Sequence, residues 1–270
     1  MTADVVLERG LVLTSAGYIH YRAAGSGMPV LILHINQQSS ALSIELVSAL
    51  ASNCRAIALD YPGHGASDHV IGNPTLEDYA GWILETIQRL ALSRVCVLGE
   101  AVGAAIAIEL ACSHPDVVDR IVLVNCPCYP DSSVVERAQK SLSGGARPQD
   151  ASGFPVTRTL EHMLQHDAIH SPMRPSQSWM DRINVAQLEA GRDRWQAVSA
   201  LHQYDIAGRL GHVQQPVLLL MGENFQYTEF MAGLESRVQN GRCEIVPNAR
   251  FCMAWECSDF IARRTIDFIG

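Results

Sequence analysis

The sequence has no tract of basic residues, no apolar run of membrane-spanning length and no motif for a bound nucleotide. Its 20 lysines and arginines are outnumbered by 28 aspartates and glutamates, which gives a formal net charge of −8. Nucleic-acid binding normally requires a clustered positive patch, so this composition disfavours it. The longest apolar runs, such as 30–33 and 217–221, have only the length of a strand. We therefore expect neither nucleic acid nor a membrane as a partner.

Cofactor and metal signatures are also missing. Neither G-x-G-x-x-G nor G-x-x-x-x-G-K-[ST] occurs, so no cofactor is expected. The eight cysteines match no zinc spacing, and several lie in apolar segments, where a reduced thiol packs as a small apolar group. His162, His166 and His170 recur every four residues, which is more typical of a solvated helix face than of a metal site. No secretory signal pattern opens the chain, and a cytoplasmic location is expected.

The chain alternates short apolar runs with segments of helical period, which predicts a mostly parallel sheet covered on both faces. The alternation stops after residue 125 and resumes after residue 200. Helical stretches are expected within the interval, at 157–168 and 185–201. We therefore predict a doubly wound α/β core formed by 1–125 and 201–270. The segment 126–200 is predicted to be a mainly helical cap inserted over the carboxyl ends of the strands, where this architecture places ligands.

A short glycine-flanked turn lies between a predicted strand and a predicted helix. It reads Leu98-Gly-Glu-Ala-Val-Gly103, and its glycines have the spacing of a G-x-S-x-G nucleophile elbow. That motif needs small flanking residues because its central residue sits in a tight, strained turn. A second segment, 60–68, reads D-Y-P-G-H-G-A-S-D, and a third, 246–251, reads V-P-N-A-R-F.

These three segments, together with Leu33-His34 and 216–223, make the chain resemble the α/β-hydrolase superfamily along nearly its whole length. The resemblance implies an α/β-hydrolase fold and a Ser-His-Asp triad. The sequence departs from the family at all three positions, because Ala101 stands for serine, Phe225 for the acid and Arg250 for the histidine. A methyl, a phenyl ring and a guanidinium cannot perform the chemistry of the triad. We therefore predict a degenerate triad.

Other groups near the elbow could still act on a substrate. The backbone N–H of Val102, with one from Ile35 or Asn36, would form the family's oxyanion site, and Gln37 would add an amide at the pocket mouth. This loop could equally be a polar turn that caps a helix. Glu100 is either a buried structural carboxylate or a general acid or base, and His34 is either structural or a base.

A second group of residues is expected to contact the substrate. Arg250 would either bind a carboxylate, enolate or phenolate or fill the vacated site with a salt bridge. Ala101 is expected to contact the substrate as well. An apolar pocket wall is suggested by Phe225, Phe251, Cys252, Met253 and Trp255, although ordinary core residues would produce the same pattern.

The leading functional hypothesis is a non-hydrolytic, cofactor-independent enzyme of the cyclase, lyase or isomerase type. It would act on a small, largely apolar molecule bearing carbonyl or phenolic oxygens, without a covalent serine intermediate. One alternative is a non-catalytic small-molecule binding protein. Another is a serine hydrolase in which Ala101 is an engineered replacement. The sequence leaves open whether the protein forms a homodimer.

Overall fold

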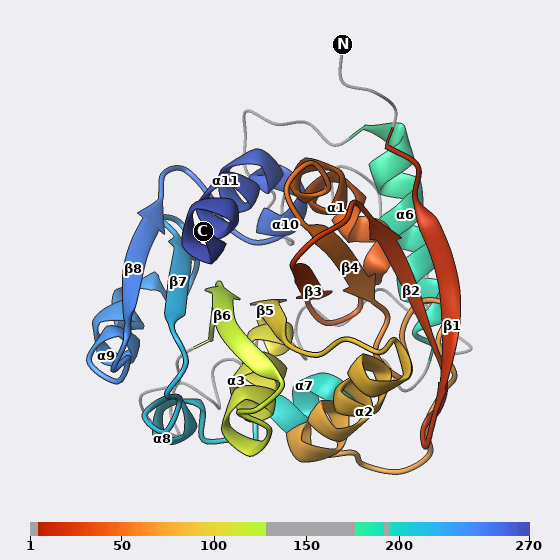
Figure 1. Cartoon of the computed structure of the whole chain (residues 1–270), viewed down its shortest axis with the longest axis horizontal. Helices are drawn as coiled ribbons and strands as arrows, with labels where there is room; N and C mark the ends of the chain where they lie inside the picture. Colours follow the sequence, from red (N-terminus) through yellow and green to blue (C-terminus); the bar gives the residue numbers. More distant parts are fainter. Residues whose placement is uncertain (1–4, 128–175, 192–194) are drawn as a thin grey trace, which may run out of the picture.

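An eight-stranded sheet forms the centre of the molecule (Figure 1). The computed structural model describes residues 5–127, 176–191 and 195–270. Its strands are β1 (Glu8–Thr14), β2 (Gly17–Ala24), β3 (Pro29–Leu33), β4 (Arg55–Leu59), β5 (Val95–Glu100), β6 (Val118–Val124), β7 (Val217–Gly222) and β8 (Gly241–Val246). Their order is β1-β2-β4-β3-β5-β6-β7-β8, in which β2 pairs antiparallel with both β1 and β4 and all other pairs are parallel. This is the mostly parallel α/β-hydrolase sheet that the sequence predicts.

Helices cover both faces of the sheet (Figure 1). One face packs against α1 (Ile44–Leu50), α10 (Met253–Glu256) and α11 (Ser258–Ile269). The other packs against α2 (Leu76–Arg89), α3 (Val102–Ser113), α7 (Gln196–Leu201), α8 (Ile206–Leu210) and α9 (Met231–Glu235). The remaining elements are the 3-10 turns η1 (Ser40–Ser43) and η2 (Thr228–Phe230) and the helix α6 (Gln177–Glu189).

The central strands are apolar on both sides because both sides are buried. In β3, Leu31 and Leu33 join the core under α2 and α3, whereas Val30 and Ile32 join the core under α1 and α11. A strand with helices on both faces needs a continuous apolar run rather than an alternating one. The continuous apolar run at 30–33 therefore indicates a strand at the centre of the sheet.

The helix α2 begins where the sequence places it. The Thr75 side chain accepts a hydrogen bond from the Asp78 backbone N–H, and the Asp78 carboxylate accepts one from the Thr75 N–H. This reciprocal capping box satisfies two N–H groups that a helix start would otherwise leave without partners.

The predicted helix 185–201 is wrong in its bounds, because two helices occupy that region. The first, α6, ends at Glu189, and Gly191 follows with a φ of 58°. A left-handed glycine just beyond a helix end is a common stop. The second, α7, begins at Gln196. The predicted helix 157–168 lies outside the described residues.

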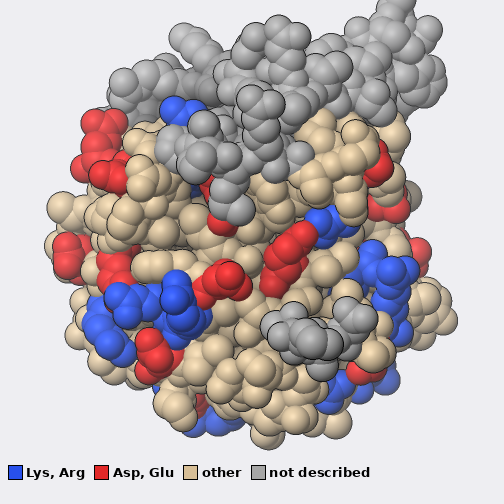
Figure 2. Space-filling view, turned by 90° about the horizontal axis from the view of Figure 1, so that it is seen from above, with Lys and Arg blue, Asp and Glu red and all other residues tan. Residues whose placement is uncertain are grey.

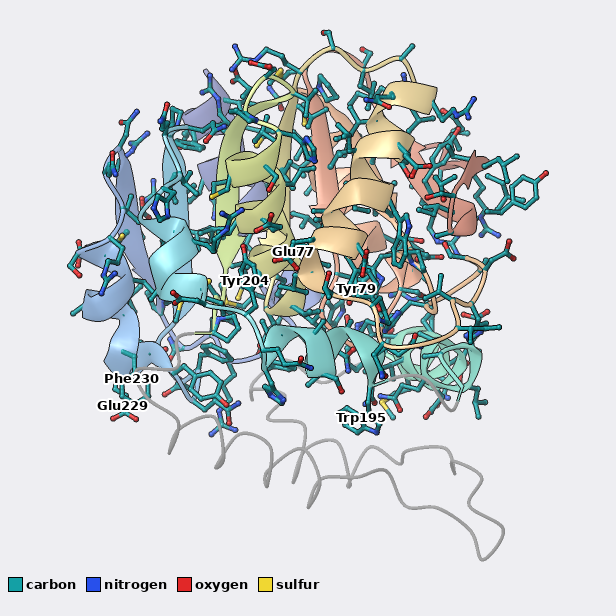
Figure 3. The ribbon with its side chains drawn as sticks, turned by 90° about the horizontal axis from the view of Figure 1, so that it is seen from below. Glu77, Tyr79, Trp195, Tyr204, Glu229 and Phe230 are labelled. Carbon is teal, nitrogen blue, oxygen red and sulfur yellow. The ribbon has the colours of Figure 1, made fainter. Side chains whose placement is uncertain are left out.

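The segment after α7 is bound firmly to the core. The hydroxyl of Tyr204, labelled in Figure 3, donates to Glu109 of α3 at 2.7 Å, and Arg209 of α8 pairs with the same carboxylate at 2.7 Å. Ala197 and Leu201 of α7 lie in the apolar cluster that contains α2 and α3. The division of the chain into a core and a cap at 126–200 stays a prediction.

The surface carries charges of both signs. Figure 2, which looks down on one face, shows basic and acidic side chains interspersed there. Within the described residues, no helix is both long enough and apolar enough to cross a membrane.

Candidate active site at the strand-to-helix elbow

Ala101 occupies the tip of a strained turn between β5 and α3. Its backbone has φ 52° and ψ −109°, a conformation that residues with a side chain rarely adopt. Close packing on both sides of the turn accounts for its glycines. A Cβ on Gly99 would lie 2.1 Å from the Gly103 oxygen, and a Cβ on Gly103 would lie 2.3 Å from the Leu33 oxygen. The backbone thus has the form of a nucleophile elbow, with a methyl group at its tip.

The elbow leaves backbone donors at its helical end. Val102 is the first residue of α3, so its N–H has no carbonyl one turn earlier within the helix. The N–H groups of Ala104 and Ala105 both donate to the Ala101 oxygen, at 3.0 and 3.4 Å. An N–H at a helix start favours negative charge, so the Val102 amide suits a developing oxyanion.

The loop after β3 lies beside the elbow, since the Leu33 and His34 oxygens approach Gly103. Gln37 in this loop has a φ of 59°, and the Gln38 side chain donates from Nε2 to the Cys252 sulfur at 3.3 Å. The Ser39 side chain caps η1, which bears out the polar-turn interpretation of this segment. That capping role does not occupy Asn36, whose buried Oδ1 has no hydrogen-bond partner among the described residues.

Asp60 holds this loop in place. Its carboxylate accepts hydrogen bonds from the Ser40 N–H, from the Ala66 N–H at 3.1 Å and from His20 Nδ1 at 2.8 Å. Burial raises the pKa of Asp60, but the hydrogen bond from His20 and the backbone donors outweigh it and the pKa is lowered. The D-x-P-G-H-G-type loop therefore serves as a structural tie between β2, β4 and the loop after β3.

Phe225 contacts Phe251 rather than Arg250. The two phenyl rings stack with their centroids 5.9 Å apart and their planes 17° apart, and Phe251 also packs against the cluster that contains Ala101. In a triad the base must meet both the acid and the nucleophile. Of these two neighbours it is thus Phe251 that lies against Phe225, and the assignment of Arg250 to the base position stays a prediction.

The hydrogen bonds that hold the Arg250 backbone explain why Phe251, and not Arg250, lies beside Phe225. Its carbonyl oxygen accepts a hydrogen bond from Asn125 Nδ2, while Asn125 Oδ1 accepts from the Gly222 N–H at 2.9 Å. These bonds fix Arg250 against the ends of β6 and β7, so the next residue is the one beside Phe225. Within the described residues the Arg250 side chain forms no ion pair, and its buried Nε has no hydrogen-bond partner.

Glu100 is 2% exposed and engages the start of α10. Its two carboxylate oxygens accept hydrogen bonds from the N–H of Met253 at 2.6 Å and of Ala254 at 3.2 Å. Burial raises its pKa to about 7, against the opposing effect of those two donors. Both oxygens are therefore occupied by backbone, and this geometry favours the structural interpretation over the acid–base one.

His34 follows β3 and is stacked on Tyr61, with ring centroids 4.0 Å apart. Its Nδ1 lies 2.7 Å from the Ile35 carbonyl oxygen. A carbonyl can only accept, so Nδ1 carries the proton and Nε2 carries a lone pair. That Nε2 is buried without a partner in the described part of the chain. Burial lowers the pKa of His34 to about 4, so the imidazole is neutral at pH 7.

Apolar residues from distant parts of the chain meet around the elbow, and we name this group the α6 interface cluster. Its buried members are Ile35, Leu42, Ala101, Trp179, Met180, Ile183, Ala186 and Cys252. The cluster places α6 over the elbow and the loop after β3. Arg182 of α6 fixes that position, since its guanidinium donates to the Ala41 oxygen at 2.6 Å and pairs with Glu45 of α1.

Met253 lies elsewhere than predicted, and Trp179 joins the cluster without having been predicted. Met253 packs in the core under α1 and α11 rather than in the α6 interface cluster, although its N–H binds Glu100. Trp179, which the sequence reading did not single out, lies fully buried in the cluster and stacks on Trp255 at 4.3 Å. No local pattern around residue 179 marks this role, because it arises only from tertiary packing.

Within the described residues, no group of three or more histidine, cysteine, aspartate or glutamate side chains could hold a metal ion. His162, His166 and His170 lie outside the described residues.

The fold agrees with that of known proteins. The model of the alpha/beta hydrolase fold family matches residues 28–255, and the chain belongs to that family. A solved structure of an E-2-(acetamidomethylene)succinate hydrolase superposes with a TM-score of 0.80 at 20% identity, covering 98% of this chain and 99% of that one.

Curated relatives extend over almost the whole chain. Haloalkane dehalogenase 2 of Mycobacterium tuberculosis is 26% identical over 277 aligned residues, covering 95% of this chain and 93% of the relative. A 2-hydroxy-6-oxononadienedioate/2-hydroxy-6-oxononatrienedioate hydrolase of Pseudomonas putida is 25% identical, covering 93% and 91%. These relatives are enzymes named for hydrolysis or dehalogenation. The expectation of a non-hydrolytic cyclase, lyase or isomerase is therefore wrong, because the relatives point to hydrolytic catalysis.

Proposed function

We propose that this protein hydrolyses a small organic molecule held between the elbow and α6, and that water attacks the substrate directly. The strained backbone of Ala101 is the observation that carries the proposal. A conformation of this kind costs about 1–3 kcal/mol and is normally kept where it serves a site. A methyl group gains nothing from the strain, but the turn still directs the Val102 N–H to the oxyanion position.

We further propose that the triad is lost, which makes a covalent intermediate at residue 101 unworkable. Ala101 has no nucleophilic atom, and the stacked rings of Phe225 and Phe251 can neither donate nor accept the proton. Enzymes stripped of their triad retain a catalysis of about 10³–10⁴-fold over water from the oxyanion site and binding. Rates of that order are expected here.

His34 is the base that we propose for the attacking water. Its Nδ1–H is held by the Ile35 carbonyl, and the Nε2 lone pair is without a partner among the described residues. The water oxygen bonds to the electrophilic carbon while its proton moves to Nε2. The bond to the leaving group then breaks, and Nε2 returns the proton to that group. A pKa of about 4 makes His34 a weak base, consistent with modest rates.

The substrate class follows from the surrounding groups. The α6 interface cluster would pack against an apolar body, and Arg250 would bind a carboxylate through the Nε that lacks a partner. Gln37 is 6% exposed in the loop after β3 and is proposed to line the same site. The printed name of the Pseudomonas putida relative describes a dioate substrate, which is compatible with a carboxylate-binding arginine.

Glu100 is proposed as a structural residue that joins the elbow to α10, because backbone donors occupy both of its oxygens. A cytoplasmic location is also proposed. It is supported by the buried, free thiols of Cys54 and Cys96, which suit a reducing compartment.

The test compares p-nitrophenyl acetate with mono-p-nitrophenyl succinate, which adds a carboxylate to the same leaving group. We expect the unaltered protein to hydrolyse these esters above the buffer rate, and His34→Asn to lower kcat at least tenfold. The control His212→Asn should leave the rate unchanged, because His212 is exposed in the turn after α8. Arg250→Gln is expected to raise KM about tenfold for the succinate only. Equal rates in His34→Asn and the unaltered protein would exclude His34 as the base.

A further inference from the structure

Trp179 presents a hydrogen-bond donor that no residue in the described part of the chain accepts. The residue is completely buried in the α6 interface cluster, yet its indole Nε1 has no acceptor among the described residues. Leaving such a donor without a partner costs about 1–3 kcal/mol, and native proteins rarely accept that cost without a water or ligand to satisfy it.

The indole is also held in one orientation. Its ring stacks on Trp255 of α10 at 4.3 Å with an interplanar angle of 29°. Its backbone N–H donates to the Ser176 side chain at 3.1 Å, which fixes the first turn of α6. One turn further on, Arg182 anchors the helix to Ala41 and Glu45. The donor is therefore preorganised rather than free to turn toward another partner.

The neighbours of Trp179 define which ligand could meet the donor. Ala101 and Ile35 belong to the same cluster, so the indole lies on the α6 side of the site whose opposite side is the elbow. The other buried side chains of the cluster are aliphatic or sulfur-containing and offer the indole no strong acceptor, and no described backbone carbonyl accepts its N–H either. A ligand that occupies this site must bring its own acceptor.

We propose that Trp179 is a substrate-binding and specificity-determining residue, whose indole N–H donates to a carbonyl oxygen of the ligand. This inference rests on the proposed function for the location of the site but not for the reaction. It narrows the substrate to oxygenated molecules with an apolar body and a carbonyl oxygen facing α6. A hydrocarbon of the same shape would leave the donor without a partner and bind less tightly.

Acetophenone and α-methylstyrene test this directly, because they differ only in C=O against C=CH₂. Their dissociation constants would be measured by tryptophan fluorescence and calorimetry for the unaltered protein, Trp179→Phe and Trp255→Phe. Phenylalanine at 179 keeps an aromatic ring in the stack and removes the donor together with part of the ring volume. Trp255→Phe is the matched control, since it alters the other ring of the same stack and leaves the Trp179 N–H in place.

The expected result is a preference for acetophenone of about tenfold in the unaltered protein and in Trp255→Phe, lost in Trp179→Phe. An equal preference in Trp179→Phe would overturn the proposal, as would saturable binding of neither probe to the unaltered protein. Circular dichroism of each variant distinguishes loss of the donor from loss of the fold. Donor-dependent binding without any ester hydrolysis would overturn the proposed reaction and leave this inference standing.

Discussion

The rings of Phe225 and Phe251 stack with their centroids 5.9 Å apart and their planes 17° apart, and we propose that they occupy the acid and base positions of the fold. On that proposal, two groups that interact through dispersion and burial stand in place of a carboxylate–imidazole pair. The elbow itself carries the methyl group of Ala101, while its backbone keeps the strained form of a nucleophile elbow.

Rebuilding the triad tests which residue stands at the base position. The variant Ala101→Ser with Phe225→Asp and Phe251→His is expected to gain a serine that a fluorophosphonate probe labels covalently, because the base then contacts both partners. The control variant carries the same Ala101→Ser and Phe225→Asp substitutions but has Arg250→His instead of Phe251→His. It is expected to stay unlabelled. Labelling of the Arg250→His variant instead would show that the offset of one residue is mistaken. Intact mass measures the labelling, and circular dichroism confirms that both variants fold.

The elbow glycines make a sharp stability prediction. Gly103→Ala would place a methyl 2.3 Å from the Leu33 backbone oxygen, which cannot yield as a flexible side chain would. We expect a loss of about 3 kcal/mol or more in urea unfolding. Gly81→Ala, in the middle of α2 with nothing within 4 Å, is the control and should stabilise by about 0.5–1 kcal/mol. Similar effects of the two substitutions would contradict the close approach.

The buried His34 predicts a loss of stability in acid. Its pKa is lowered from 6.5 to about 4 on folding, so below pH 6.5 the unfolded chain binds a proton that the folded protein excludes. The free energy of unfolding is therefore unaffected by the titration of this residue above pH 6.5, and it falls by about 3 kcal/mol as the pH drops toward 4. Urea unfolding at pH 4, 5, 6 and 7 measures this slope. We expect His34→Asn to flatten it, and an unchanged slope in that variant would exclude His34 as its source.

The pair Arg182–Glu45 is expected to contribute more than an ordinary surface pair, because the same guanidinium also donates to the Ala41 oxygen and the site is largely covered. A double-mutant cycle with Arg182→Ala and Glu45→Ala should give a coupling of about 1 kcal/mol. The more exposed pair Arg264–Glu244 is the control, with an expected coupling below about 0.5 kcal/mol. Equal couplings would mean that Arg182 does not anchor α6.

Much of this arrangement could be predicted from local sequence. Gly99 and Gly103 mark the elbow because only glycine permits the close approach of strand and helix, and the apolar run of β3 marks the central strands. These features are fixed by short-range sterics and burial, so a short segment is enough to show them.

The remaining features depend on contacts between distant segments. Asn125, which follows β6, holds the Arg250 carbonyl, and Phe251 then lies beside Phe225. Trp179 joins the site only because α6 folds back over residues 35 and 101. Neither relationship leaves a signature in the spacing of nearby residues.

The clearest test of direct attack by water follows the hydrolysis of mono-p-nitrophenyl succinate and measures the intact mass of the protein in samples quenched during turnover. We expect turnover above the buffer rate with no succinyl adduct on the protein at any time point, because residue 101 carries no nucleophile. A mass increase of one succinyl group during turnover, or no turnover above buffer, would contradict hydrolysis by direct attack.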